Sequence, residues 1–257
     1  MPNKFKIAAA TNVGLVRTNN EDNFVVCPDL VVPSWQTPQT PDELMTCSRV
    51  GSLLCVADGM GGMNAGEVAS AIAVETIKDV FSSSEAILSM KSSDPSKIES
   101  FLKKTVAIAD KRIKERALED PASSGMGTTI VLAWIIDAVA HIAWCGDSRA
   151  YLFNRQYGLS RLTKDHSYVQ QLVDNGELDP DWAFYHPNSN IITRSLGDSP
   201  VKAVPDYISK KLVSGDTVLL CSDGLCGICR DDEIMNVMID SGDNIEKCLD
   251  NLIDLAL

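Results

Sequence analysis

The order of apolar and polar residues along the chain predicts several β-strands. Apolar runs or alternations of strand length occupy residues 4–11, 52–57, 128–136, 138–145, 150–153 and 217–221. Asp137 alone separates two of these segments, so we expect a tight hairpin at that position.

Helical periodicity alternates with these strands. Apolar residues recur at helical spacing over residues 65–81 and again over residues 97–118, which predicts two long amphipathic helices. A shorter helix is expected over residues 165–177. It leads into an irregular, proline-containing stretch, residues 178–190, that we expect to overhang a site.

Hairpins mixed with long helices predict an α+β fold in which helices cover antiparallel β-sheets, rather than a regular βαβ alternation. Residues 28–52 and 82–96 have the composition of a long loop and a polar connection. With 257 residues and 45% hydrophobic content, the chain can bury one substantial core. We therefore expect residues 1–257 to form a single domain.

The charge balance argues against several classes of partner. Asp and Glu outnumber Lys and Arg by 35 to 23, so the net charge of −12 repels polyanions, and nucleic acid is not expected to bind. The longest apolar stretch, residues 130–144, is interrupted by Asp137 and His141 and is too short to span a membrane. Charged and apolar residues alternate at positions 4–7, unlike a signal peptide, and predict a cytoplasmic protein.

Eight cysteines in such a chain are expected to be buried residues or free thiols rather than disulfides. Cys226 and Cys229 form a C-x-x-C pair, which leaves a thiol-redox or zinc-binding function as an alternative. The chain has no second cysteine or histidine pair at zinc spacing, so this alternative is disfavoured.

Three predicted strands end in the same way, with an apolar run followed by Asp58, Asp147 or Asp223. One such aspartate ordinarily starts a turn. Three carboxylates that converge at strand ends repel one another and lose hydration, unless a hard cation such as Mg²⁺ or Mn²⁺ neutralises them. The repetition therefore favours a metal site.

A fourth acidic element, the pair Glu21 and Asp22, follows Arg17 by four residues. Taken alone, the pair is equally well explained as a solvated turn between two strands. Beside a metal cluster, Arg17 would be suited to bind phosphate, because a guanidinium group donates two parallel hydrogen bonds to phosphoryl oxygens.

Other catalytic plans fit the sequence poorly. The chain has no Walker A pattern, and the residues Gly-Asp-Ser-Arg-Ala at 146–150 lack the closing glycine of a nucleophile elbow. Only His141, His166 and His186 are available, and His141 lies within a predicted strand, so a Ser-His-Asp triad is not favoured.

Six short motifs follow one another along nearly the whole chain. They are TNVGLVR with NED (residues 11–22), VADGMGG (56–62), GMGTT (125–129), CGDSRA (145–150), ITRSLGD (192–198) and CSDGL (221–225). In this order they resemble the PP2C-like (PPM) family of metal-dependent serine/threonine protein phosphatases. The resemblance implies a sandwich of two antiparallel β-sheets flanked by α-helices, with a binuclear Mn²⁺ or Mg²⁺ centre at one end.

The resemblance also implies a set of metal ligands. Asp58 would bridge the two cations. The carbonyl of Gly59 and the pair Glu21 and Asp22 would serve one cation, directly or through water, and Asp223 would serve the other.

Further roles follow from the same resemblance. Asp147 would hold a third, weaker cation together with Asp223, Arg17 would bind the phosphate, and Asp22 would orient the attacking water. The implied substrates are phosphorylated proteins, products of a serine/threonine kinase, and the protein is expected to be a monomer. Residues 178–190 fall where the family carries a flap, which is expected to influence substrate choice.

The sequence departs from the family pattern at two points. Met60 stands where animal members carry a histidine proposed as general acid, so water is the expected proton donor. The pair Asp243 and Asn244 resembles the last metal-binding motif but follows Asp223 by only 20 residues and precedes a helical pattern. We expect Asp243 to lie at a helix N-terminus, and the chain to stop before the final metal-binding aspartate and last strand. A catalytically impaired homologue that binds phosphoproteins is the alternative function.

Overall fold

The structure is a computed structural model that describes residues 4–35, 43–61, 65–83, 85–91, 93–198 and 203–257. Its strands are β1 (Lys4–Phe5), β2 (Asp22–Cys27), β3 (Met45–Thr46), β4 (Ser52–Met60), β5 (Gly127–Thr128), β6 (Ile130–Ile136), β7 (Val139–Cys145), β8 (Arg149–Asn154), β9 (Gly158–Arg161), β10 (Asp206–Lys211) and β11 (Asp216–Cys221). Its α-helices are α1 (Gly66–Ser83), α2 (Pro95–Glu119), α3 (Tyr168–Asp174), α4 (Pro180–Ala183), α5 (Asp223–Cys226), α6 (Asp231–Asp240) and α7 (Ile245–Ala256), and two short 3₁₀ helices cover Glu85–Ser89 and Pro121–Ser123.

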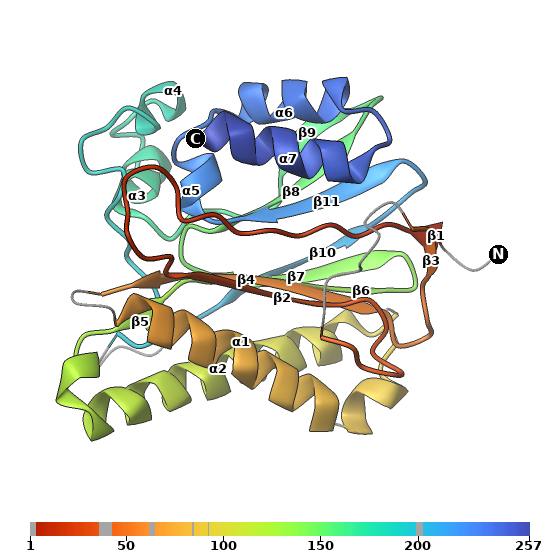
Figure 1. Ribbon diagram of the computed structural model, residues 1–257, viewed down its shortest axis with the longest axis horizontal. Coiled ribbons are helices and arrows are strands. Elements are labelled where there is room, and N and C mark those ends of the chain that lie inside the picture. Colours follow the sequence, from red (N-terminus) through yellow and green to blue (C-terminus); the bar gives the residue numbers. More distant parts are fainter. Residues whose placement is uncertain (1–3, 36–42, 62–64, 84, 92, 199–202) are drawn as a thin grey trace.

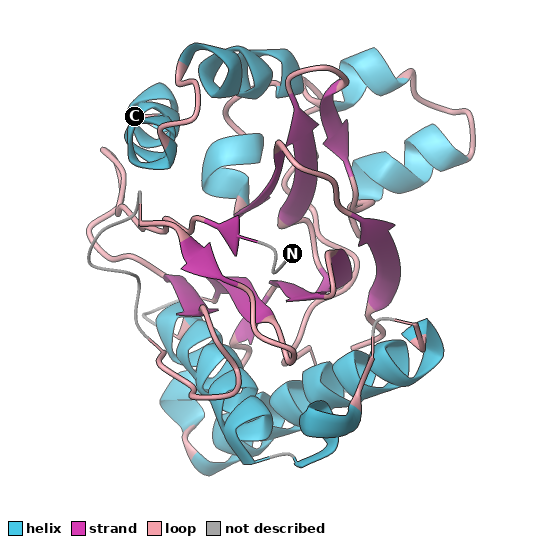
Figure 2. Cartoon of the chain, turned by 90° about the vertical axis from the view of Figure 1, so that its right-hand side faces the viewer, coloured by secondary structure: helices cyan, strands magenta, loops and turns pink. Residues whose placement is uncertain are grey.

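Two antiparallel sheets form the centre of the molecule (Figure 1). The larger has the strand order β10-β7-β6-β4-β2, with β5 also paired to β4, and the smaller has the order β11-β8-β9. Helices α1 and α2 cover the outer face of the larger sheet, and α6 and α7 cover the smaller one (Figures 1 and 2). The predicted α+β sandwich of two antiparallel sheets flanked by helices is confirmed.

A hydrophobic cluster lies between each pair of neighbouring layers. Beneath α1 and α2, the rings of Phe81 and Trp134 meet edge to face with centroids 5.4 Å apart. Between the sheets, Val131 of the larger sheet and Val218 of the smaller belong to a second cluster. A third cluster contains Leu252 of α7. Because β6 is covered on both faces, its sequence is a continuous apolar run rather than an alternation.

The predicted helices are present with small changes in their bounds. The two long ones are α1 and α2, and Pro95 is suited to the first turn of α2, where a missing N–H costs nothing. The short helix expected after residue 165 is α3, which begins after Ser167, whose hydroxyl accepts a hydrogen bond from the backbone of Gln170. The irregular stretch 178–190 contains the single turn α4.

The strand predictions need several corrections. The expected hairpin at Asp137 is confirmed, because Asp137 and Ala138 have positive φ angles of 50° and 59°, as a two-residue hairpin turn requires. The strand expected over residues 4–11 is wrong beyond Phe5, because the small residues 8–10 interrupt the alternation and no described strand pairs with them. The long loop at 28–52 contains β3, and the polar connection at 82–96 contains a short 3₁₀ helix.

Strands β9 and β10 were not predicted, because their sequences are polar. β10 ends in Lys210 and Lys211, and it owes its place in the sheet to a ladder of six residue pairs with β7. All eight cysteines are free thiols, and Cys226 and Cys229 are buried. None of the helices in the described ranges combines the length and apolar character needed to cross a bilayer.

Candidate metal centre and active site

The first two carboxylates of the site lie opposite each other in the larger sheet. Asp22 is the first residue of β2, and the antiparallel register pairs it directly with Asp58 in β4. The expectation that Asp58 lies beyond the end of its strand is wrong, since β4 continues to Met60. The strand is longer because Gly59 and Met60 pair with β5.

The backbone of Asp58 is held on both sides by two threonines. The amide of Thr129 and the hydroxyl of Thr128 both donate to the carbonyl of Asp58, over 2.8 and 2.9 Å. The amide of Asp58 in turn donates to the hydroxyl of Thr129 over 3.1 Å. Both threonines are buried, so these bonds fix the position of Asp58 within the sheet.

The third carboxylate comes from the smaller sheet. Asp223 follows β11 and is the first residue of the single turn α5. The hydroxyl of Ser222 donates to the carboxylate of Asp22 over 2.6 Å, and this bond joins residues 200 positions apart in the sequence. The bond therefore ties the ends of the two sheets together at the site.

The fourth carboxylate, Asp147, lies in the turn between β7 and β8. The preceding Gly146 has a φ of 122°, and a side chain there would collide with Thr129. Asp147 is only 8% exposed, and its Oδ1 atom is buried without a hydrogen-bond partner. A buried carboxylate oxygen without a partner is costly, which suits a position next to a cation.

The pKa values show that these carboxylates affect one another. Burial, followed by the charges of Asp223 and Asp22, raises the pKa of Asp58 to about 10. Burial and the charge of Asp223 raise the pKa of Asp147 to about 7. The pKa of Asp22 is also raised, mainly by burial, although the hydrogen bond from Ser222 works in the opposite direction. Buried like charges of this kind are stabilised by a cation.

Glu21, Gly59 and Arg17 complete the predicted set. The amide of Gly59 donates to the carbonyl of Glu21 over 3.1 Å, and a side chain at Gly59 would collide with the carbonyl oxygens of Glu21 and Gly66. Glycine is therefore needed for β2, β4 and the start of α1 to meet here. Arg17 is 66% exposed and forms an ion pair of 2.8 Å with Glu21, which places its guanidinium beside the acidic group.

The oxygen donors fit a hard divalent cation such as Mn²⁺ or Mg²⁺, because carboxylate and carbonyl oxygens are the ligands that such ions prefer. In the part of the chain that the structure describes, no three Asp, Glu, His or Cys side chains converge into a ready-made cage. The four aspartates interact through their charges, so drawing them closer requires a cation to offset their repulsion.

Other candidate residues lie outside this group. Asp243 is exposed and forms an ion pair of 3.9 Å with Arg155, while the side chain of Asn244 caps α7 by accepting from the amide of Lys247. Asp243 therefore lies in the turn one residue before the N-cap of α7, and Asn244, rather than Asp243, caps the helix. His141 is buried in β7, where Nδ1 lies 2.7 Å from the hydroxyl of Tyr207.

Comparison with known proteins identifies the family. The family described as protein phosphatase 2C matches residues 40–251. The serine/threonine phosphatase stp of Listeria monocytogenes serovar 1/2a is 38% identical over 186 residues, which cover 72% of this chain and 71% of that protein. The chain therefore belongs to the protein phosphatase 2C family of metal-dependent phosphatases, and it is a serine/threonine protein phosphatase.

Solved structures agree with this assignment. The serine/threonine phosphatase Stp1 from Staphylococcus aureus has a TM-score of 0.79 and 32% identity, and the match covers all of this chain and 89% of Stp1. The catalytic domain of the phosphatase PstP, solved in complex with two manganese ions, has a TM-score of 0.71 and 27% identity, covering all of this chain and 90% of that domain.

Sequence reasoning did not assign a role to Ser222, Thr128 or Thr129. All three lie in the motifs singled out from the sequence, CSDGL and GMGTT. The motifs show that these residues accompany the aspartates, but their hydrogen bonds to Asp22 and Asp58 depend on how distant strands pack together.

Proposed function

We propose that the chain, folded as one domain, hydrolyses phosphoserine and phosphothreonine in proteins with water activated at a centre of two divalent cations. The observation that carries this proposal is the position of Asp58. Its carboxylate lies opposite Asp22 and within the field of Asp223, and these charges, with burial, raise its pKa to about 10. The ionised form of the Asp58 carboxyl is disfavoured without metal, and two bound cations would stabilise it.

The remaining residues would share the two cations. Asp58 would bridge them, the carbonyl of Gly59 and the pair Glu21 and Asp22 would serve one, and Asp223 would serve the other. The two manganese ions in the solved PstP domain support this number and type of cation. Asp147 would hold a weaker third cation with Asp223, which is supported by its buried, unpartnered Oδ1 atom.

Bound cations of this kind lower the pKa of water and offset negative charge on phosphoryl oxygens. The chain supplies orientation. Asp22 would accept a hydrogen bond from the attacking water and align it, which is supported by the hydroxyl of Ser222 that holds its carboxylate. Arg17 is exposed and can leave Glu21 to donate two hydrogen bonds to the phosphate.

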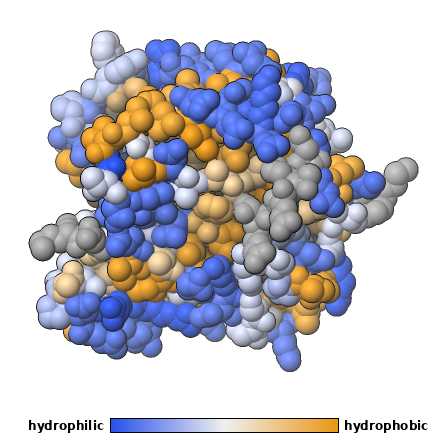
Figure 3. Space-filling view, viewed as in Figure 1, coloured by the Kyte–Doolittle hydropathy of each residue, from blue (hydrophilic) through white to orange (hydrophobic). Residues whose placement is uncertain are grey.

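The substrates proposed are proteins phosphorylated by a serine/threonine kinase, and the protein is proposed to act as a monomer in the cytoplasm. Eight free thiols support a reducing compartment. Exposed apolar side chains adjoin Arg17, namely Leu15 and Val16, and hydrophobic surface is visible where the N-terminal segment passes α5 (Figure 3). A protein substrate could contact this surface with apolar residues beside its phosphorylated side chain, whereas a small phosphate ester has no such residues.

Calorimetric titration with Mn²⁺, with turnover of a phosphothreonine peptide recorded alongside, tests the proposal. We expect the chain to bind Mn²⁺ and release phosphate, and Asp58→Asn to lose both. Asp79→Asn is the matched control, because Asp79 is a surface carboxylate paired with Arg112 on the helical layer. The proposal is wrong if the chain binds no Mn²⁺, or if Asp58→Asn binds and turns over as the parent does.

A further inference from the structure

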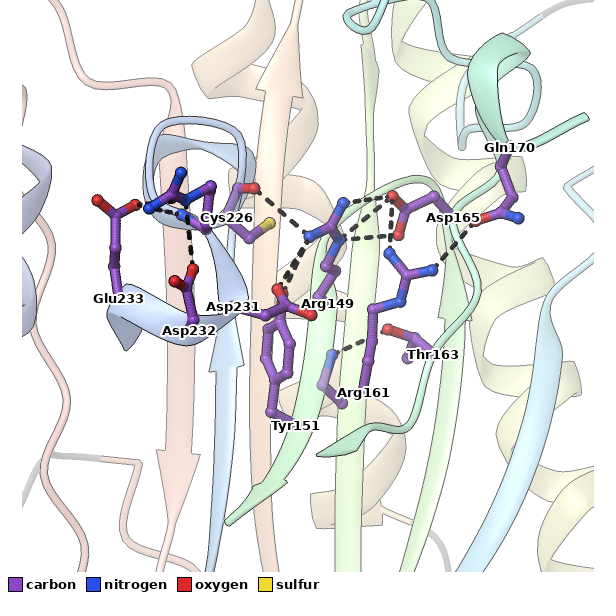
Figure 4. Close-up of polar contacts among 12 residues, drawn as sticks. Arg149, Tyr151, Arg161, Thr163, Asp165, Gln170, Cys226, Asp231, Asp232 and Glu233 are labelled. Atoms are coloured by element: carbon purple, nitrogen blue, oxygen red, sulfur yellow. Dashed lines mark hydrogen bonds and ion pairs between the residues drawn. The ribbon is translucent and has the colours of Figure 1, made fainter. Parts of the chain in front are cut away.

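Arg149 lies at the centre of a polar network that includes Asp165, Tyr151, Cys226 and Asp231 (Figure 4). It is the first residue of β8, two positions after Asp147. Its Nε and Nη2 atoms donate to the carboxylate of Asp165 over distances between 2.7 and 3.2 Å. Its Nη1 atom donates to the hydroxyl of Tyr151 over 3.0 Å and to the carbonyl of Cys226 over 3.4 Å. All three nitrogens therefore have partners within the protein.

One arm of the network reaches the helix that begins with Asp223. That helix, α5, is only four residues long. A single turn is not stable by itself, so its position depends on contacts with the rest of the fold. The guanidinium of Arg149 donates to the carbonyl of Cys226 at the end of α5, and the side chain of Cys226 is buried. Arg149 thus anchors the turn whose first residue is Asp223.

The network extends to the start of α6. The hydroxyl of Tyr151 donates to Asp231 over 2.7 Å, and Nη1 of Arg149 lies 3.6 Å from the same carboxylate. Asp231 is the first residue of α6, and four residues separate it from the end of α5. The link from α5 to α6 is therefore held at both ends by the same guanidinium.

A second arm reaches the turn that carries Asp147. The amide of Gly146 donates to Nδ1 of His166 over 3.1 Å, and the amide of His166 donates back to the carbonyl of Gly146 over 2.9 Å. Asp165 precedes His166 and is held by Arg149. The ion pair between Arg149 and Asp165 therefore connects the start of β8 to the segment around residue 165, and the bonds between His166 and Gly146 connect that segment to the Asp147 turn.

We infer that Arg149 is a positioning residue of the metal centre, which holds the Asp147 turn and the Asp223 helix at a defined separation. Its side chain is only 17% exposed and each of its three nitrogens donates within the protein, so it is not positioned to bind the substrate. Lysine cannot replace it, because an ammonium group lacks the planar fork of donors on three nitrogens that these contacts use. This inference rests on the proposed function, since it concerns the same carboxylates.

Calorimetric Mn²⁺ titration of Arg149→Lys tests the inference, at a temperature where circular dichroism shows that parent and variant are both folded. We expect the Mn²⁺ affinity of the variant to fall about 10–100-fold, as is typical when the groups that orient metal ligands are changed. Arg112→Lys is the control, because Arg112 pairs with Asp79 on the helical layer, away from this network. It should bind Mn²⁺ like the parent.

The melting temperature in the presence of chelator separates positioning from general stability. A purely structural role predicts that Arg149→Lys melts earlier but binds Mn²⁺ with the affinity of the parent, and this result would overturn the inference. If the parent itself bound no Mn²⁺, the proposed function would fail first, and the inference with it.

Tyr151→Phe is a second variant for the case in which Arg149→Lys does not fold. It removes one hydroxyl partner of Arg149 and Asp231 without changing any charge. We expect the Mn²⁺ affinity of this variant to fall by about 2–10-fold. An unchanged affinity for Tyr151→Phe in that case would also overturn the inference.

Discussion

Asp22 and Asp58 are cross-strand partners in the β2–β4 ladder, so two of the proposed metal ligands face each other directly in a sheet. Like charges in this relationship destabilise a sheet. The surrounding fold holds them in place through the hydroxyl of Ser222 on Asp22 and the two threonines on the backbone of Asp58. The site thus combines a rigid backbone with side chains whose repulsion a cation would offset.

Asp58→Asn is expected to stabilise the metal-free protein and to abolish its stabilisation by Mn²⁺. With a pKa of about 10, metal-free folded Asp58 holds a proton at pH 7 that the unfolded chain releases, and this proton uptake disfavours folding. Asparagine removes the cost, so the free energy of unfolding in chelator at pH 7 should rise by about 1 kcal/mol or more. Differential scanning calorimetry with chelator and with Mn²⁺ measures both effects. A metal-free variant less stable than the parent would contradict the electrostatic account of this site.

Arg17→Ala is expected to weaken turnover of a phosphopeptide without a comparable loss of Mn²⁺ affinity. Charge-assisted hydrogen bonds contribute about 1.5–3 kcal/mol, so kcat/KM should fall about 10–100-fold. Arg17→Lys should retain part of the activity, since it keeps the charge but not the paired donors. Initial rates of phosphopeptide turnover by both variants test this prediction, and Arg112→Ala is the surface control. Equal rates for the parent and Arg17→Ala would exclude the phosphate-binding role of Arg17.

Ser222→Ala is expected to weaken Mn²⁺ binding more strongly at low pH than at high pH. The hydroxyl of Ser222 lowers the pKa of Asp22 against the effect of burial, so its loss raises that pKa and lets protons compete better with the cation. We expect about a 2–10-fold loss of affinity near pH 6 and a smaller loss near pH 8. Calorimetric titrations at both pH values, with Ser83→Ala as control, measure this difference, and a loss independent of pH would show that the hydroxyl acts in another way.

His141 is expected to make the folded protein less stable as the solution is acidified. Burial lowers the pKa of His141 from 6.5 to about 4, so the unfolded chain binds the proton more tightly than the folded one between these values. The contribution of neutral His141 is complete above pH 6.5, and up to about 3 kcal/mol is lost as the pH falls to 4. Urea unfolding of the parent and of His141→Gln between pH 4 and 7 measures it, and parallel pH profiles would contradict the prediction.

The long helices α1 and α2, the helices α3 and α7, the hairpin at Asp137 and most strands of the sandwich could be predicted because local periodicity determines them, whereas α4, α5 and α6 were not predicted. The long helices show a stripe of apolar residues, and β6 shows the continuous apolar run of a strand buried on both faces. The failures have a common cause. β10 is polar and owes its place to its ladder with β7, and residues 6–11, in which the small residues 8–10 interrupt the alternation, lack a described strand partner.

The sequence by itself determined the family and the identity of the proposed ligands, because the motifs around Asp58, Asp147 and Asp223 are short, contiguous segments that can be recognised without knowledge of the tertiary structure. Only the tertiary structure decided that Asp58 lies inside a strand opposite Asp22, that Ser222 reaches Asp22 across 200 positions, and that Arg149 joins two parts of the site. These relationships depend on strand register and on the packing of one sheet against the other. Register and packing are set by contacts between residues far apart in the chain, and local sequence patterns do not specify them.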